Sequence, residues 1–184
     1  MVPLVIGIII LVVIIVLWYI ATYNRLVNLQ QTVKNSWSQI DVQLKRRHDL
    51  IPNLVETVKG YAAHERETLE AVIKARQMAV DAKSMEDRQQ AENMLTSTLR
   101  SLFAVAEAYP NLKANENFMM LQEELAGTEN KIAFARQHYN DVVAVYNALI
   151  KSIPASIVAN NGGFTEEKFF EIESGDREVP SVSF

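Results

Sequence analysis

The sequence contains no cysteine, and glycine and proline are scarce, with 6 and 5 among 184 residues. Without cysteine the chain can form no disulfide, thiolate metal site or thiol nucleophile. Neither glycine nor proline falls between residues 8 and 51, so no strong helix breaker interrupts that segment. Charged side chains are also missing before Arg25. The chain therefore opens with a segment that can form one long helix, the first part of which is uncharged.

The uncharged part is almost entirely aliphatic, with 14 Ile, Leu or Val among the 17 residues from 4 to 20. A run of this length can cross about 30 Å of hydrocarbon. We predict that residues 1–22 form a membrane anchor, with Trp18, Tyr19 and Tyr23 at the membrane interface. A cleaved signal peptide is the alternative. It needs basic residues before the apolar run and small residues at the cleavage site, and neither is found here.

The basic residues Arg25 and Lys34 follow the apolar segment closely, whereas no basic side chain precedes it. Loops rich in Lys and Arg stay on the cytoplasmic side of a membrane. We therefore expect a single-pass protein with its amino terminus outside and its folded part in the cytoplasm.

Residues 23–153 have the spacing of amphipathic helices. Apolar residues at 26, 29, 33, 37, 40 and 44 are separated by three or four positions, which places them on one helix face. Three further helices are predicted over about 62–83, 86–108 and 115–151, and the last has an unbroken three–four seam from Leu121 through Val142 to Leu149. These patterns predict an all-α protein. Its N-terminal transmembrane helix is continuous with the first helix of an antiparallel four-helix bundle.

Smaller features complete this prediction. Pro52 is expected to kink the first helix or to begin a new one, and Gly60 to end or bend it. The inner face of the second helix is predicted to comprise Leu69, Val72, Ile73, Arg76 and Val80. That of the third is predicted to comprise Ala91, Leu95, Leu99, Leu102 and either Val105 or Ala106. Residues 154–184 are predicted to form an extended tail, flexible at 160–163, packed in its first half and mobile over 175–184.

The three histidines are the first place to look for chemistry. His64-Glu65 begins like a zinc-protease motif, but Thr68 stands where the second histidine ligand is needed. The Glu-x-x-His pairs of di-iron bundles are missing, because Lys45, Tyr61 and Ala135 stand three residues before the histidines. No metal or other cofactor is therefore expected.

A second cluster of polar residues precedes Pro52. A hydrolase could use the region of His48, Asp49, His64 and Glu65, but no nucleophile elbow accompanies it. The conservative interpretation is an N-cap or a salt-bridged helix joint near Pro52, with residues 45–47 forming a solvated face or a partner contact. The candidate partner-binding residues are Arg46, Arg47, His48, Asp49, His64, Glu65, Phe164, Phe169 and Phe170.

Several segments together resemble the LemA family. The matching segments are 23–27, 37–40, 43–56, 58–62, 64–65, 129–133, 135–136, 139–140 and 154–170. The resemblance covers nearly the whole chain. It implies a bacterial protein with an N-terminal membrane span and a four-helix soluble domain, and it implies no enzyme activity.

From these observations we expect a scaffold or adaptor anchored in the bacterial inner membrane, not an enzyme. Its expected partners are the lipid bilayer, further copies of itself and other membrane proteins, and packed copies could shape the membrane. The alternative is an accessory subunit or sensor of a membrane protease or transporter. The net charge of −4 argues against nucleic acid as a partner, and no small-molecule substrate is predicted.

Overall fold

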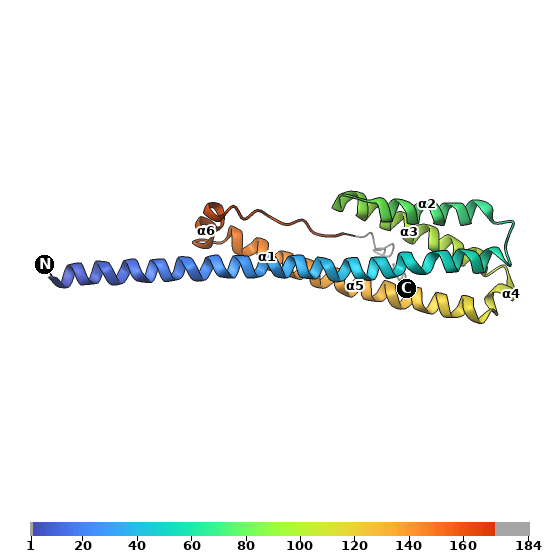
Figure 1. Ribbon diagram of the computed structural model, residues 1–184, viewed down its shortest axis with the longest axis horizontal. Helices are drawn as coiled ribbons and strands as arrows, with labels where there is room; N and C mark the ends of the chain where they lie inside the picture. The colour runs from blue at the N-terminus through green and yellow to red at the C-terminus, as the bar shows by residue number, and fades with distance from the viewer. Residues whose placement is uncertain (1, 172–184) are drawn as a thin grey trace, which may run out of the picture. The chain divides into compact units, whose positions relative to one another are not determined.

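The computed structural model describes residues 2–171, and the segment predicted to be mobile, 175–184, lies outside them. Within this described part every regular element is a helix, so the all-α prediction is confirmed there (Figure 1). The helices are α1 (Val2–Lys59), α2 (Arg66–Asp81), α3 (Met85–Ala106), α4 (Pro110–Lys113), α5 (Glu116–Lys151) and α6 (Ala155–Gly162).

Helix α1 runs without interruption from Val2 to Lys59, so the apolar segment and the first polar helix are one element. By length and composition α1 could cross a membrane, and no part of its apolar stretch is buried. Pro52 lies inside α1 and does not begin a new helix. The helix ends immediately before Gly60, as predicted.

The chain divides into two compact units. The first contains the chain up to Asp41 together with Ala133–Phe169, which means the first part of α1, the last part of α5 and α6. The second contains Val42–Ile132 and Phe170, and therefore α2, α3, α4 and the remaining parts of α1 and α5.

In the first unit, α1 and α5 each bury one stripe of residues. The buried residues are Leu26, Val33, Ser36 and Ile40 from α1, and Tyr139, Val143, Tyr146, Asn147 and Ile150 from α5. The α5 stripe includes Val143 and Ile150, whereas the predicted Val142 and Leu149 are only half-buried. The predicted and the observed residues both keep the three–four spacing, so the spacing alone does not determine which of them are buried. Packing against the neighbouring helix determines it. Trp37 and Tyr139 meet edge to face, with ring centroids 5.5 Å apart.

The predicted tail begins with a helix that the sequence analysis missed. Helix α6 follows α5 at an angle of 99° and buries Ala155, Val158 and Ala159. Gly163 ends it in the left-handed conformation, with φ 72°, and the Phe164 N–H donates to the Ala159 carbonyl at 3.0 Å. Glycine adopts this conformation without steric cost. Residues 160–163 are therefore an ordered helix end, not the flexible segment that was predicted.

Beyond α6 the chain is held against α5. The Asn147 side chain pairs with both backbone groups of Glu167: its amide donates to the carbonyl at 2.9 Å, and its oxygen accepts from the N–H at 3.0 Å. The Tyr139 hydroxyl donates to the Lys168 carbonyl at 2.8 Å. Lys151 and Glu166 form an ion pair at 2.8 Å. Three successive residues are thus fixed by side chains of α5.

Two buried tyrosines of α5 allow a matched test of these contacts. Burial, with a smaller effect of the Glu167 charge, raises the pKa of Tyr139 to about 12, so its hydroxyl remains a donor at neutral pH. The buried Tyr146 hydroxyl makes no hydrogen bond within the described part of the chain. Tyr139→Phe should lower the free energy of unfolding by about 1 kcal/mol, and Tyr146→Phe should be neutral or stabilising. Urea unfolding followed by circular dichroism measures both. Equal losses would show that the Lys168 contact is irrelevant.

In the second unit, α1, α2, α3, α4 and α5 contribute to one apolar core. The predicted inner face of α3 is confirmed, because Ala91, Leu95, Leu99, Leu102 and Ala106 are all buried. The short helix α4 was not predicted; it begins at Pro110, whose missing N–H is no loss at a first helical position.

The prediction for α2 was partly wrong. Leu69 and Val72 are buried, but Ile73 and Val80 are 51% and 49% exposed, and Ala75 and Ala79 are buried in their place. Small side chains at a helix contact allow a shorter distance between the helix axes. The predicted start at 62 was early, because buried Ala62 lies in the turn that precedes α2.

Candidate functional site

A buried polar cluster joins α1, α3 and α5 in the second unit. Arg47 of α1 forms ion pairs through Nη2 with Glu92 of α3 and through Nη1 with Glu129 of α5. Its Nη1 also donates to Thr96 Oγ1 at 3.2 Å. His48 Nε2 donates to the second carboxylate oxygen of Glu92 at 2.8 Å. One glutamate therefore binds two consecutive side chains of α1.

This cluster lies in the interior, not on the surface. Arg47 is 1% exposed, Glu92 0% and His48 8%. The interpretation of residues 45–47 as a solvated face or partner contact is therefore wrong for Arg47. His48 is likewise not accessible to a partner.

The helical spacing of α1 explains why Arg47 points inward. Leu44, Arg47 and Ile51 are separated by three and four residues, so the arginine continues the apolar stripe. Glu92 lies next to the buried Ala91 and three residues before Leu95, which places it at the edge of the α3 stripe. The apolar packing of both helices thus brings the two charges together.

The pairing determines the charge state of Glu92. Burial alone would raise the pKa of Glu92, but the hydrogen bond from His48 and the positive charge of Arg47 outweigh it, so the pKa lies below its ordinary value of 4.5. The carboxylate is therefore ionised at neutral pH. Charge-assisted hydrogen bonds of this kind are stronger than neutral ones.

A second contact compensates for Pro52. Proline has no N–H, so the carbonyl four residues earlier, that of His48, loses its partner within α1. Arg76 of α2 supplies a replacement: its Nε donates to the His48 carbonyl at 2.7 Å. Arg76 was predicted to lie on the inner face of its helix, and this contact gives it a specific role.

The Arg76 contact should depend on Pro52. Arg76→Met removes the donor and should lower the free energy of unfolding by about 1–3 kcal/mol, because a partly buried carbonyl is left unpaired. In a Pro52→Ala background the alanine N–H can bond the same carbonyl, so Arg76→Met should cost clearly less. A double-mutant cycle by chemical unfolding measures the difference. If the cost of Arg76→Met is equal in both backgrounds, the compensation does not operate.

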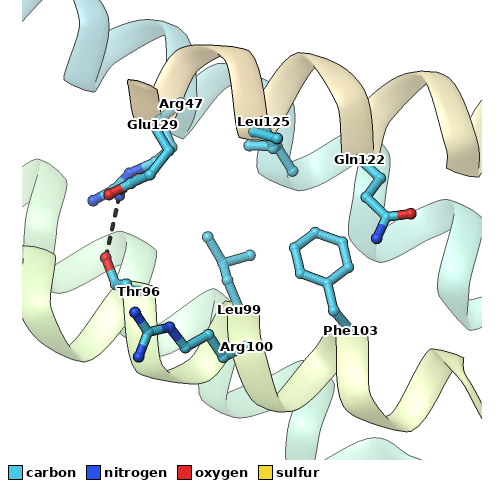
Figure 2. A pocket seen from close by; sticks show the side chains of 9 residues that line it. Arg47, Thr96, Leu99, Arg100, Phe103, Gln122, Leu125 and Glu129 are labelled. Carbon is cyan, nitrogen blue, oxygen red and sulfur yellow. Dashed lines mark hydrogen bonds and ion pairs between the residues drawn. The ribbon is translucent and has the colours of Figure 1, made fainter. Parts of the chain in front are cut away.

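A cleft of about 260 Å³ lies beside the polar cluster, between α3 and α5 (Figure 2). Leu99 and Phe103 of α3 point toward Leu125 of α5, and Arg47, Thr96 and Glu129 close one end. The cleft is mostly apolar. Arg47 and Glu129, the charged groups at this end, form an ion pair with each other. We therefore assign them a structural role and no ligand.

The remaining predicted polar residues do not join the cluster. Arg46 lies 3.7 Å from Glu124, and both side chains are about half exposed, at 50% and 45%. Asp49 and His64 are exposed. Glu65 accepts a hydrogen bond from the Tyr109 hydroxyl at 2.8 Å. The structure thus pairs His48 with Glu92 and Glu65 with Tyr109, and it does not assemble the four residues of the hydrolase hypothesis into one site.

The predicted aromatic residues lie in different environments. Trp18 is 37% exposed and Tyr19 is half-buried. Tyr23 meets Phe164 edge to face, with ring centroids 5.5 Å apart. Phe169 is 46% exposed, whereas Phe170 is 0% exposed and therefore not accessible to a partner.

Glu92 and Glu129 were not singled out from the sequence. The available signal was the charge at Arg47 on an otherwise apolar stripe, because a buried arginine requires an acidic partner. The need for an acidic partner does not show which Asp or Glu of the chain supplies it. Among residues 2–171 no group of three or more Asp, Glu or His side chains is placed to hold a metal ion.

The described residues define an all-helical protein with an N-terminal helix able to cross a membrane and, in the second unit, a buried arginine–glutamate–histidine cluster. The chain belongs to the LemA family, whose model matches residues 36–184, and the resemblance seen in the sequence is thereby confirmed.

Individual relatives are distant. The chain is 24% identical to magnetosome protein MamQ of Magnetospirillum gryphiswaldense, over 85% of this chain and 68% of that protein. It is 26% identical to protein LemA of Metamycoplasma hominis, over 77% of this chain and 65% of that protein. Magnetosome protein MamQ 2 of Paramagnetospirillum magneticum is 24% identical, with coverage of 85% and 68%. The chain therefore spans about two thirds of the length of these relatives.

Proposed function

We propose that this protein is a membrane-anchored helical scaffold. The observation that carries the proposal is the first part of α1. Its aliphatic side chains between residues 4 and 20 are 49–70% exposed, yet the helix continues without a break into a segment that buries one stripe of residues. Exposed aliphatic surface on this scale is unfavourable in water and favourable in a bilayer. The anchor is single-pass and lies in the bacterial inner membrane.

The remaining helices provide the folded part of the scaffold. In this proposal α1, α2, α3 and α5 form an antiparallel four-helix bundle in the second unit. The Arg47–Glu92–Glu129 ion pairs connect three of these helices internally, and Arg76 connects the fourth to α1. The charged groups in the interior are committed to one another. We therefore assign no reaction to them, and we propose that the outer faces of the helices bind partners.

The outer face of α5 is the proposed surface for self-association. Phe134 is 73% exposed and Val145 is 52% exposed. They are 11 residues apart, about three helical turns, and so share one side of α5. An exposed aromatic side chain is a typical interface anchor.

Crosslinking of the full chain in native membranes, followed by mass spectrometry, tests this role. The expected result is crosslinks between copies, reduced by Phe134→Glu and unchanged by Ile73→Glu, a control residue that is 51% exposed on α2. Crosslinks only to other membrane proteins would favour the accessory-subunit or sensor alternative. A chain that remains monomeric at high concentration in detergent would contradict self-association.

The orientation has a separate test. Arg25 and Lys34 follow the apolar segment, so the proposed location of the folded part is the cytoplasm. A reporter fused after Phe184 that is active only in the cytoplasm should therefore be active. Activity of a reporter that works only outside the cytoplasm would reverse the assignment.

A further inference from the structure

The connection between α5 and α6 forms an uncharged end of the first unit. No charged residue occurs between Lys151 and Glu166. Ile153, in the turn between the two helices, is 88% exposed, and Ile157 on α6 is 58% exposed. The opposite face of α6 is buried through Ala155, Val158 and Ala159. Two large aliphatic side chains, one in the turn and one on α6, are thus exposed, while the opposite face of α6 is packed.

Contacts within the first unit locate this end along α1. Tyr139 of α5 meets Trp37, and Phe164 after α6 meets Tyr23. From Trp37 back to Tyr23, α1 covers about 21 Å, and α5 covers about 18 Å from Tyr139 to its end, at 1.5 Å per residue. The two helices therefore run antiparallel here, and α5 ends close to the level of Tyr23.

Tyr23 follows the aliphatic run of α1 by only three residues. That is about 4.5 Å of helix, whereas the headgroup layer on each side of the hydrocarbon is about 5–8 Å thick. A bilayer that covers residues 4–20 therefore brings its headgroup layer to Tyr23. A side chain added at Gly162 would approach Tyr23 Cε2 to 3.1 Å, so the end of α6 lies at the same level.

The direction of α6 fits a surface helix. It turns by 99° from α5, which lies along α1 in this unit, and therefore runs crosswise to α1 (Figure 1). When α1 crosses a bilayer, a crosswise helix at this level lies near the membrane plane. Ile153, two residues beyond the end of α5, then lies on the side toward the lipid.

We infer that α6 and the turn before it rest on the bilayer surface, with Ile153 and Ile157 at the boundary between headgroups and acyl chains. The inference rests on the proposed anchoring by α1. Lys151, paired with Glu166 and 62% exposed in its side chain, lies beside this patch, where a lysine amine can reach anionic headgroups. The bilayer is favoured over a second copy as the surface that covers Ile153 and Ile157, because a membrane around the anchor brings its headgroup layer to Tyr23 and to the end of α6.

Spin labels on single cysteines test the inference, since the chain has no cysteine of its own. The full chain carrying Ile153→Cys or Ile157→Cys is reconstituted into phosphatidylcholine–phosphatidylglycerol vesicles. Collisions with oxygen, which concentrates in hydrocarbon, are compared with collisions with a water-soluble nickel chelate. Val42→Cys, 62% exposed on α1 and 22 residues beyond the end of the aliphatic run, is the matched control, and Val12→Cys reports on the anchor itself.

The expected ratio of oxygen to nickel collisions at 153 and 157 is severalfold above that at 42 and below that at 12. Ratios at 153 and 157 equal to that at 42, with a hydrocarbon value at 12, overturn the inference and leave the anchoring intact. A water-like value at 12 overturns the anchoring itself. Protection of 153 and 157 from both reagents indicates a second copy and also overturns the inference.

Discussion

Replacing Glu92 with glutamine is expected to lower the free energy of unfolding by about 3–5 kcal/mol, because the substitution leaves a buried arginine without its main counter-charge. The Glu92 side chain is 0% exposed, and it binds both Arg47 and His48. Glutamine keeps the shape but not the charge. Urea unfolding of the full chain in detergent, followed by circular dichroism, measures the loss.

The adjacent ion pair provides the control for Glu92. Arg46 and Glu124 are 3.7 Å apart, and both side chains are about half exposed. Exposed pairs contribute little, so Arg46→Ala should change the free energy of unfolding by less than about 1 kcal/mol. A loss at Arg46 comparable with that at Glu92 would mean that burial is not the reason for the effect.

The effect of Glu92→Gln should also depend on pH. Because the pKa of Glu92 is lowered in the folded state, its contribution to stability is complete above its ordinary value of 4.5. The contribution is lost as the pH falls through the folded pKa, where wild-type Glu92 becomes neutral like glutamine. The difference between the two proteins should therefore shrink in acid. A difference that stays constant from neutral to acidic pH would contradict the assigned charge state.

The second large effect is expected in the anchor. At about −0.3 to −0.6 kcal/mol each, its 14 aliphatic residues favour insertion by about 4–8 kcal/mol. Each arginine near the centre of a span opposes insertion by about 2.5–3.5 kcal/mol and also removes an aliphatic residue. Val12→Arg combined with Ile15→Arg should therefore cancel most of the gain and release the chain from membranes at alkaline pH.

Membrane partition of the double variant should be compared with two controls. Val12→Leu with Ile15→Leu keeps the segment apolar and should remain in the membrane fraction. Val42→Arg places the same charge at a position 62% exposed outside the apolar segment, and it should also remain. Release of either control, or retention of the double arginine variant, would show that the segment is not the membrane anchor.

Periodicity in the sequence predicted much of the helical structure. The stripe Ala91, Leu95, Leu99, Leu102 and Ala106 is buried as predicted. These residues are apolar on one side of a helix, and the polar side cannot replace them in a core. The part of α1 between residues 8 and 51 is uninterrupted, as the absence of glycine and proline there predicts.

Other features depended on contacts distant in sequence. Pro52 remains inside α1 because Arg76, 24 residues later, satisfies the carbonyl that proline leaves open. On α2 both Ile73 and Ala75 fit a helical stripe, and burial of the alanine depends on how closely the neighbouring helix approaches. Helix propensity and residue spacing do not predict the distance between two packed helices.

The candidate site was only half visible in the sequence. Arg47 and His48 stood out as polar residues within the helical pattern before Pro52, but their burial and their common partner Glu92 could not be predicted. The partner lies 44 and 45 residues away on another helix, so no local pattern connects them. Helix α6 was missed for a similar reason. Its eight residues are too short for a clear period, and its packing on the first unit supplies the stability that propensity lacks.

The most direct test of the membrane-anchored scaffold is a cysteine scan along α1 in native membranes. Single cysteines from position 8 to position 40 are treated with a water-soluble maleimide, and the labelled fraction is measured at each position. The account predicts protection throughout 8–20. From about Arg25 onward it predicts reactivity with helical periodicity, low at the buried Leu26, Val33 and Ile40 and high between them. Uniform reactivity from position 8 onward would contradict the account.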